Sequence, residues 1–131
     1  MENEFVTYSI AKKLNELGFN KSCFAYFRNN IIVYVNRWNF ETTKSHTIKQ
    51  DDITNEVDDI ILAPLWQQAI DFLREEYDFI VNPTVDYKGI YHWIVAWPIS
   101  SYQVDTEDIN GNTWYRAREN AIIKTLELIE K

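Results

Sequence analysis

The 131-residue sequence has one cysteine, three glycines, three prolines and two histidines, and each shortage excludes a class of protein. With Cys23 alone, neither an intramolecular disulfide nor a cysteine metal cluster can form. The glycines at positions 18, 89 and 111 are too far apart for a glycine-rich phosphate loop. No apolar run approaches the length of a membrane-spanning helix.

Basic residues are also scarce. The chain has 13 Lys and Arg against 20 Asp and Glu, a formal net charge of −7. Proteins that bind DNA or RNA along a whole face usually carry a surplus of Lys and Arg, because much of the affinity comes from releasing counterions. The charge therefore argues against extended nucleic acid as a partner, while a local pocket for a small anion is still allowed.

What the chain has in quantity is apolar and aromatic side chains, 46% and 15% of the residues. At this length a packed core can form without disulfides or metals, so we expect one domain over residues 1–131. The start, Met1 to Glu4, has neither a basic nor an apolar run typical of a signal peptide. The expected location is cytoplasmic.

Hydrophobic periodicity alternates along the chain between helical and strand-like. It predicts a helix over 8–17, a hairpin over 23–38 turning at 28–30, a helix over 64–77, a hairpin over 79–99 and a helix over 114–130. Residues 39–62 are predicted to be mostly loop, with room for a short strand over 42–49.

The predicted fold class is α+β, in the order αββαββα. The two helix–hairpin segments align, since Ile10 matches Ile70 and Phe19 matches Phe79. We therefore expect an antiparallel sheet of about four strands with helices packed mainly on one face.

Residues 12–19, 23–27 and 63–77 carry a resemblance to a group of small hypothetical proteins of Bacteroidetes and their phages. The resemblance implies a compact domain of this kind. It also implies a bacterial or phage origin, so that the protein would be made in a bacterial or phage-infected host cell. It implies no activity and no site residues. A phage origin would favour a host-interaction or anti-defence role.

Residues able to carry catalysis are few and poorly spaced. His46 and His92 lack metal-ligand spacing, and Cys23 begins an apolar strand, which is typical of a packed thiol. The acidic pairs at 51–52, 58–59 and 75–76 lack the pattern of a calcium loop. We therefore expect a protein that is not an enzyme and needs no metal or cofactor.

The aromatic residues point to a surface. Alternation places Tyr91, Trp93 and Trp97 on one face of the last predicted strand. In the first hairpin the same reasoning places Phe24, Tyr26, Tyr34 and Trp38 on one face. Arg28 lies at the turn. The predicted binding residues are Tyr26, Arg28, Tyr34, Trp38, Tyr91, Trp93 and Trp97.

Three fates are open for such an aromatic sheet face. It is covered by loops or core, it forms a homodimer, or it is a platform on which a base or another flat ligand stacks, since large apolar patches usually mark an interface or a ligand site. The leading hypothesis is a binding protein that engages a host protein or sequesters a nucleotide-like small molecule. The alternative is a structural or assembly protein that associates with itself through this face.

Overall fold

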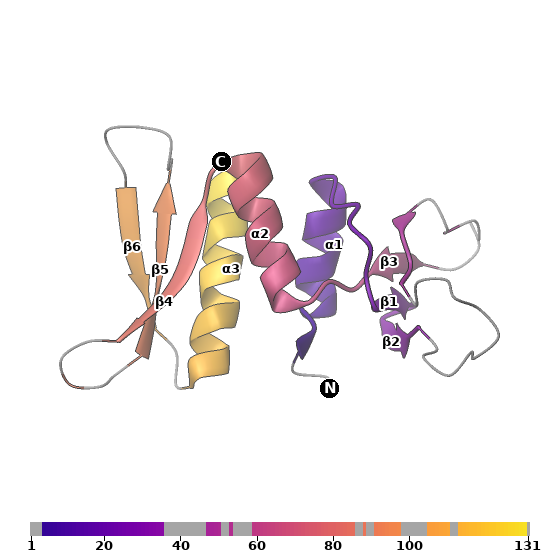
Figure 1. Ribbon diagram of the computed structural model, residues 1–131, viewed down its shortest axis with the longest axis horizontal. Helices are drawn as coiled ribbons and strands as arrows, with labels where there is room; N and C mark the ends of the chain where they lie inside the picture. The colour runs from indigo at the N-terminus through magenta and orange to yellow at the C-terminus, as the bar shows by residue number, and fades with distance from the viewer. Residues whose placement is uncertain are drawn as a thin grey trace. The chain divides into compact units, whose positions relative to one another are not determined.

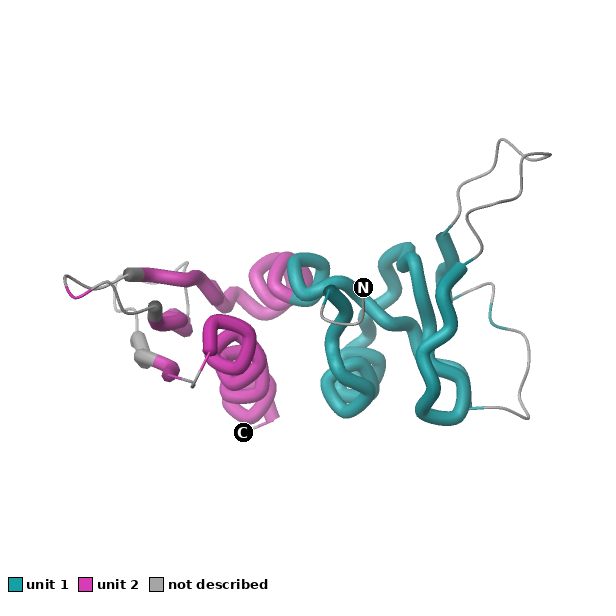
Figure 2. The backbone as a smooth tube through the Cα atoms, turned by 90° about the horizontal axis from the view of Figure 1, so that it is seen from below, with its two compact units in different colours: residues 1–69 teal, residues 70–131 magenta. Residues whose placement is uncertain are grey.

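The computed structural model describes residues 4–35, 47–50, 53, 59–85, 88, 91–97, 105–110 and 113–130. Within these ranges the chain forms three helices and six antiparallel strands, so the α+β prediction is confirmed. None of these helices has the length and apolar content needed to cross a bilayer. Backbone contacts divide the chain into two compact units, residues 1–69 and 70–131 (Figure 2).

Unit 1 contains a helix beside a three-stranded sheet (Figure 1). Helix α1 (Tyr8–Glu16) is followed by β1 (Ala25–Arg28), β2 (Ile31–Tyr34) and β3 (Ile60–Leu62). The strand order is β2-β1-β3, so β1 is central. An isolated antiparallel bridge between Cys23 and Ile48 extends the pairing beyond the start of β1.

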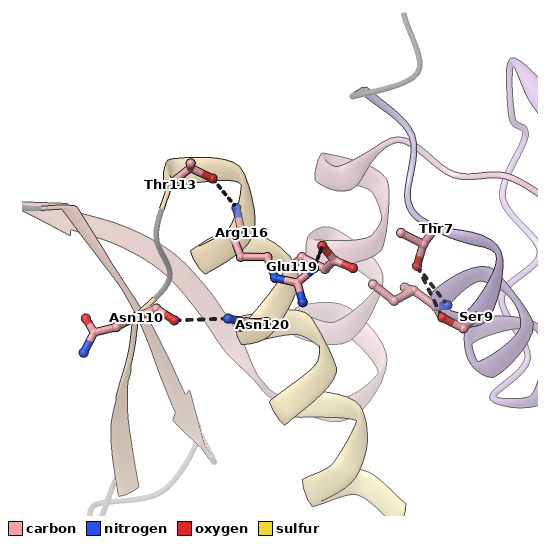
Figure 3. Close-up of polar contacts among 8 residues, drawn as sticks. Thr7, Ser9, Asn110, Thr113, Arg116, Glu119 and Asn120 are labelled. Atoms are coloured by element: carbon pink, nitrogen blue, oxygen red, sulfur yellow. Dashed lines mark hydrogen bonds and ion pairs between the residues drawn. The ribbon is translucent and has the colours of Figure 1, made fainter.

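Helix α1 begins and ends close to the predicted residues. The Thr7 hydroxyl accepts a hydrogen bond from the backbone N–H of Ile10 at 3.5 Å (Figure 3), as an N-cap does. Gly18 has φ +95, a left-handed conformation that suits glycine just past a helix. The Phe19 N–H then bonds the Leu14 carbonyl at 2.9 Å.

The β1–β2 hairpin turns through two residues in left-handed conformation, Asn29 at φ 50 and Asn30 at φ 69. This is the geometry of a two-residue hairpin turn, and it sets the register so that Arg28 pairs with Ile31. The Asn29 N–H donates to the Asp59 carbonyl at 2.8 Å, and the Asn29 side chain accepts from the Asp59 N–H at 3.0 Å. Tyr8 also donates to the Asp59 carboxylate, so the turn is held to both α1 and the residue before β3.

The core of unit 1 lies on the α1 side of this sheet. Ala25 and Phe27 are buried, and the Phe27 ring meets the Tyr8 ring edge-on with centroids 5.5 Å apart. Ile61, the Cα partner of Phe27, is also buried. From α1 the buried apolar residues are Ile10, Ala11 and Leu14.

Helix α2 (Trp66–Tyr77) begins in unit 1 and ends in unit 2. Unit 2 then continues with β4 (Ile80–Val85), β5 (Tyr91–Trp97), β6 (Asp105–Ile109) and α3 (Trp114–Glu130). The second sheet has the order β4-β5-β6. Helix α3 contacts all three strands and lies along one face of this sheet (Figure 1).

The start of α3 is fixed by side chains at its first turns. The Thr113 hydroxyl accepts from the Arg116 N–H at 3.1 Å, and Arg116 pairs with Glu119 at 3.2 Å (Figure 3). The Asn120 side chain donates to the Asn110 carbonyl at 3.1 Å, which ties the helix to the end of β6. The predicted helix over 114–130 is confirmed.

The predicted arrangement in one sheet of about four strands is wrong. The described strands form two sheets of three, in the order αβββαβββα. Strands β3 and β6 were missed: β3 has only three residues, and β6 has the acidic sequence DTEDI. Both are specified by pairing with a central strand, which local propensity does not report.

The repeat suggested by the alignment stops at the hairpins. In unit 1 the third strand joins the first strand of the hairpin, whereas in unit 2 it joins the second. The two sheets therefore differ in topology although each contains a hairpin. The prediction of a single domain stays a prediction, since α2 belongs to both units.

Candidate functional site

The described members of the seven predicted binding residues belong to two different sheets. Tyr26, Arg28 and Tyr34 belong to the sheet of unit 1, while Trp93 and Trp97 belong to the sheet of unit 2. Trp38 and the side chain of Tyr91 lie outside the described residues. Each sheet must therefore be considered separately.

Tyr34 was placed on the wrong face of the first sheet. The two-residue turn pairs Tyr34 with Ala25, whose side chain faces α1, and the Tyr34 ring accordingly meets the Phe5 ring at 5.5 Å. Tyr26 instead pairs with Val33. Directly paired residues of antiparallel strands point to the same face, so Tyr26 and Tyr34 lie on opposite faces.

The tryptophan face of β5 is the covered face of the second sheet, not an open one. Trp93 is 4% exposed, and its ring packs on Trp114 of α3 with centroids 5.1 Å apart. Trp97 is half-buried and stacks on Phe79 at 5.8 Å. This aromatic face is therefore part of the core of unit 2, the first of the three fates considered for it.

The reason is found in the partners of β5. Its opposite face carries His92 and Ile94, which pair with the polar residues Thr84 and Asn82 of β4. Val95 pairs with Val81, and both are buried. Alternation within β5 alone did not distinguish the two faces, whereas the polar residues of β4 do.

The strongest candidate surface is on unit 1, on the side of the sheet away from α1. We call it the β1–β2 face. It consists of Tyr26 and Arg28 of β1, Phe24 directly before β1, and Ile31 and Val33 of β2. Burial alternates strictly along this stretch, since Cys23, Ala25 and Phe27 are buried and the intervening side chains are not.

The exposed fraction of the apolar side chains on this face is highest at Ile31 and Phe24 and lowest at β3. Ile31 is 68% exposed and Phe24 40% exposed, whereas Leu62 of β3, the partner of Tyr26, is 2% exposed. Tyr26 and Val33 are half-buried between them. The accessible apolar surface is thus centred on the hairpin.

A cationic group lies within this apolar surface. The Arg28 guanidinium carbon is 5.9 Å from the centroid of the Tyr26 ring, within the range of a cation–π contact. Such a contact orients the guanidinium and is worth roughly 0.5–1 kcal/mol at an exposed site. The face therefore offers both a flat apolar contact and a donor for a carboxylate or phosphate.

Sequence reasoning missed Ile31 and left Phe24 out of the binding residues. The available signal was the Asn29–Asn30 turn, because a two-residue turn places Ile31 opposite Arg28. Phe24 then follows from alternation with the buried Cys23 and Ala25.

The residues considered for catalysis have structural surroundings where they are described. Cys23 is buried, and burial raises the pKa of its thiol to about 12, so the thiolate needed for attack is disfavoured. The His92 ring contacts the Asn110 side chain, and Asp59 binds Tyr8 and Asn29. Among the described residues no group of three or more His, Cys, Asp or Glu is placed to hold a metal ion.

Comparison with models of protein families, with curated proteins and with solved structures finds no match to this chain.

Proposed function

We propose that this protein acts by binding another protein, with the β1–β2 face as the centre of the contact. One observation carries the proposal: Phe24 and Ile31 expose much of their apolar surface on either side of the Arg28–Tyr26 pair. Contact surfaces of proteins typically have an apolar centre in which aromatic residues and Arg are enriched.

The size of the face defines its role. Two four-residue strands span roughly 13 Å by 10 Å, which is a small part of the roughly 800 Å² that each partner buries in a standard interface. The β1–β2 face is therefore the energetic centre of a larger contact, a role that a few central residues commonly fill.

Charge favours a protein over a nucleotide-like ligand. A net charge of −7 repels polyphosphates at long range, and Arg28 is the one cationic residue among the five described residues that define this face. A protein partner needs only an apolar ridge and one carboxylate placed for Arg28. The partner that we propose is a host-cell protein. This chain would bind it as an inhibitor or anti-defence factor, in line with the resemblance noted in the sequence.

The proposal is tested by replacing Phe24 or Ile31 with a photo-crosslinking amino acid in bacterial cells that make the protein. We expect an adduct of one discrete mass from either position, because both side chains lie on the contact surface. The adduct should be lost when Arg28→Glu is added, since the charge reversal removes the donor. The measurement is the adduct mass on a denaturing gel, followed by mass spectrometry.

Tyr115 provides the matched control, because it is an aromatic residue of unit 2 that is 57% exposed. The same crosslinker at Tyr115 should not give the adduct. Equal adducts from both positions, or none from the β1–β2 face, would contradict the proposal. An adduct of twice the chain mass from Phe24 would indicate self-association through this face, and a bound small molecule seen by native mass spectrometry would indicate a ligand site instead.

A further inference from the structure

The outer edge of the first sheet is built to pair with another strand. We propose that β2 pairs antiparallel with β2 of a second copy, which joins two three-stranded sheets into one of six strands. Among the described strands the order is β2-β1-β3, so within that part of the chain β2 is an outer strand with β1 on one side. Unprotected outer strands are templates for pairing with another chain.

The other three outer strands each have a feature that discourages such pairing. β4 contains Pro83, which lacks a backbone donor, and β6 carries the acidic residues Asp105, Glu107 and Asp108. β3 has only three residues. These are common ways in which proteins protect sheet edges. β2 has the sequence IIVY, without a charge, proline or glycine.

The hairpin geometry defines which groups face the second copy. Arg28 and Ile31 flank the two-residue turn, and the Val35 N–H bonds the Phe24 carbonyl at 2.9 Å, so alternate residues of this stretch direct their backbone toward β1. Ile32 and Tyr34 consequently direct their N–H and C=O groups outward. Two antiparallel copies satisfy these groups when Ile32 pairs with Tyr34 of the second copy.

This register places Val33 on the two-fold axis, opposite Val33 of the second copy. The pair is of the type without mutual hydrogen bonds, in which Cα atoms lie about 4.5 Å apart. The neighbouring pairs are Ile32 with Tyr34 and Ile31 with Val35, so every facing pair is apolar. Cross-strand pairs of β-branched and aromatic residues stabilise a sheet.

Charge opposes association only at long range. Each copy carries a net charge of −7, but the four residues of β2 are uncharged, so no like charges meet between the two paired β2 strands. Salt screens charges separated by more than about 10 Å at 0.1 M. We therefore expect the dimer fraction to increase with ionic strength. A contact through Arg28 and a carboxylate would weaken instead.

The inference stands whether or not the proposed function is correct. A dimer would bring two β1–β2 faces into one continuous surface around the two-fold axis, with a larger area for a partner. Phe24 lies beside the central strand, away from the axis. Phe24→Lys should therefore remove the crosslink that a partner protein forms with the crosslinker at position 31, and it should leave the dimer intact. The two proposals are thus tested separately.

The geometry is tested with Val33→Cys in the full chain. Two cysteines on the axis at about 4.5 Å between Cα atoms fall within the range for a disulfide, and native Cys23 is buried. Mild oxidation should convert most of the Val33→Cys protein into a disulfide-linked dimer. The matched control Arg28→Cys lies on the same face but away from the axis, and it should stay monomeric on a nonreducing gel.

Mass in solution gives the second measurement. The wild-type chain should show a species of twice 15.6 kDa by native mass spectrometry or light scattering, increasing with concentration and salt. Ile32→Pro should abolish it while circular dichroism is unchanged, because the N–H that proline removes points away from β1. A monomeric wild type at high concentration and salt would overturn the proposal, as would crosslinking through Arg28→Cys but not Val33→Cys.

Discussion

At the scale of single residues, Trp93 shows how an aromatic side chain suited to binding serves the core instead. It is 4% exposed and packs on Trp114 in unit 2. Its indole Nε1 is buried, and the described part of the structure supplies it with no hydrogen-bond partner. A buried donor without a partner costs about 1–3 kcal/mol. Trp93 therefore stabilises through its rings and loses part of that gain through its N–H.

We predict that Trp93→Phe changes the free energy of unfolding by less than about 1.5 kcal/mol, because removing the buried N–H offsets much of the lost contact area. Trp93→Ala should cost about 3–5 kcal/mol, as large-to-small changes in cores do. Urea unfolding followed by circular dichroism measures both. If Trp93→Phe is as destabilising as Trp93→Ala, the N–H is bonded and the interpretation fails.

At the scale of elements, the Asn29–Asn30 turn determines which side chains the first hairpin exposes. Both residues have positive φ, and they differ in their partners. Asn29 forms two hydrogen bonds with Asp59, so its side chain is needed for the link to β3. Asn30, at φ 69, occupies a position where glycine is preferred in such turns.

We predict that Asn30→Gly leaves the structure unchanged and raises the free energy of unfolding by up to about 0.5 kcal/mol, since glycine adopts positive φ without strain. Asn30→Ala should lower it by about 1 kcal/mol for the opposite reason. Thermal unfolding of the three proteins should therefore rank Gly above Asn above Ala. A higher melting temperature for Asn30→Ala than for wild type would contradict the assigned turn.

At the scale of the whole molecule, the two compact units share α2, whose residues 66–69 belong to unit 1 and 70–77 to unit 2. Both parts contribute to a core, since Trp66 and Ala69 are buried in the first and Phe72 and Leu73 in the second. A helix cannot end at its middle without exposing unpaired backbone groups. This continuity favours joint unfolding of the two units.

We predict that Leu14→Ala, which truncates a fully buried side chain of unit 1, destabilises both units by about 2–5 kcal/mol. Native-state hydrogen exchange can follow the amides of Phe27 in unit 1 and Val95 in unit 2. Equal loss of protection at both would support the single domain expected from the sequence. The reciprocal control is Leu126→Ala, which truncates a buried side chain of unit 2. It should lower the exchange protection of the Phe27 amide in unit 1 as much as that of the Val95 amide in unit 2. Loss confined to the mutated unit would show two domains.

The elements that local chemistry specifies were predicted well. Thr7 and Gly18 define the ends of α1, and the apolar stripe that includes Ala117 and Ala121 defines α3. The Asn29–Asn30 pair placed the first turn correctly. Of the candidate site, Tyr26 and Arg28 lie together on the β1–β2 face. Tyr34 and Trp93 did not join them, because each is directed toward a helix by its strand partners.

Local sequence patterns were enough to predict the α+β fold class, the three described helices and both hairpins, since periodicity, caps and turn residues act over a few neighbouring positions. Tertiary structure alone decided that the strands form two sheets, that β3 and β6 complete them, and which face of each sheet is covered. Those outcomes depend on pairing between residues far apart in the chain, such as Phe27 with Ile61 and Val95 with Glu107. No local pattern encodes a strand's distant partner, and the partner decides which side chains meet solvent.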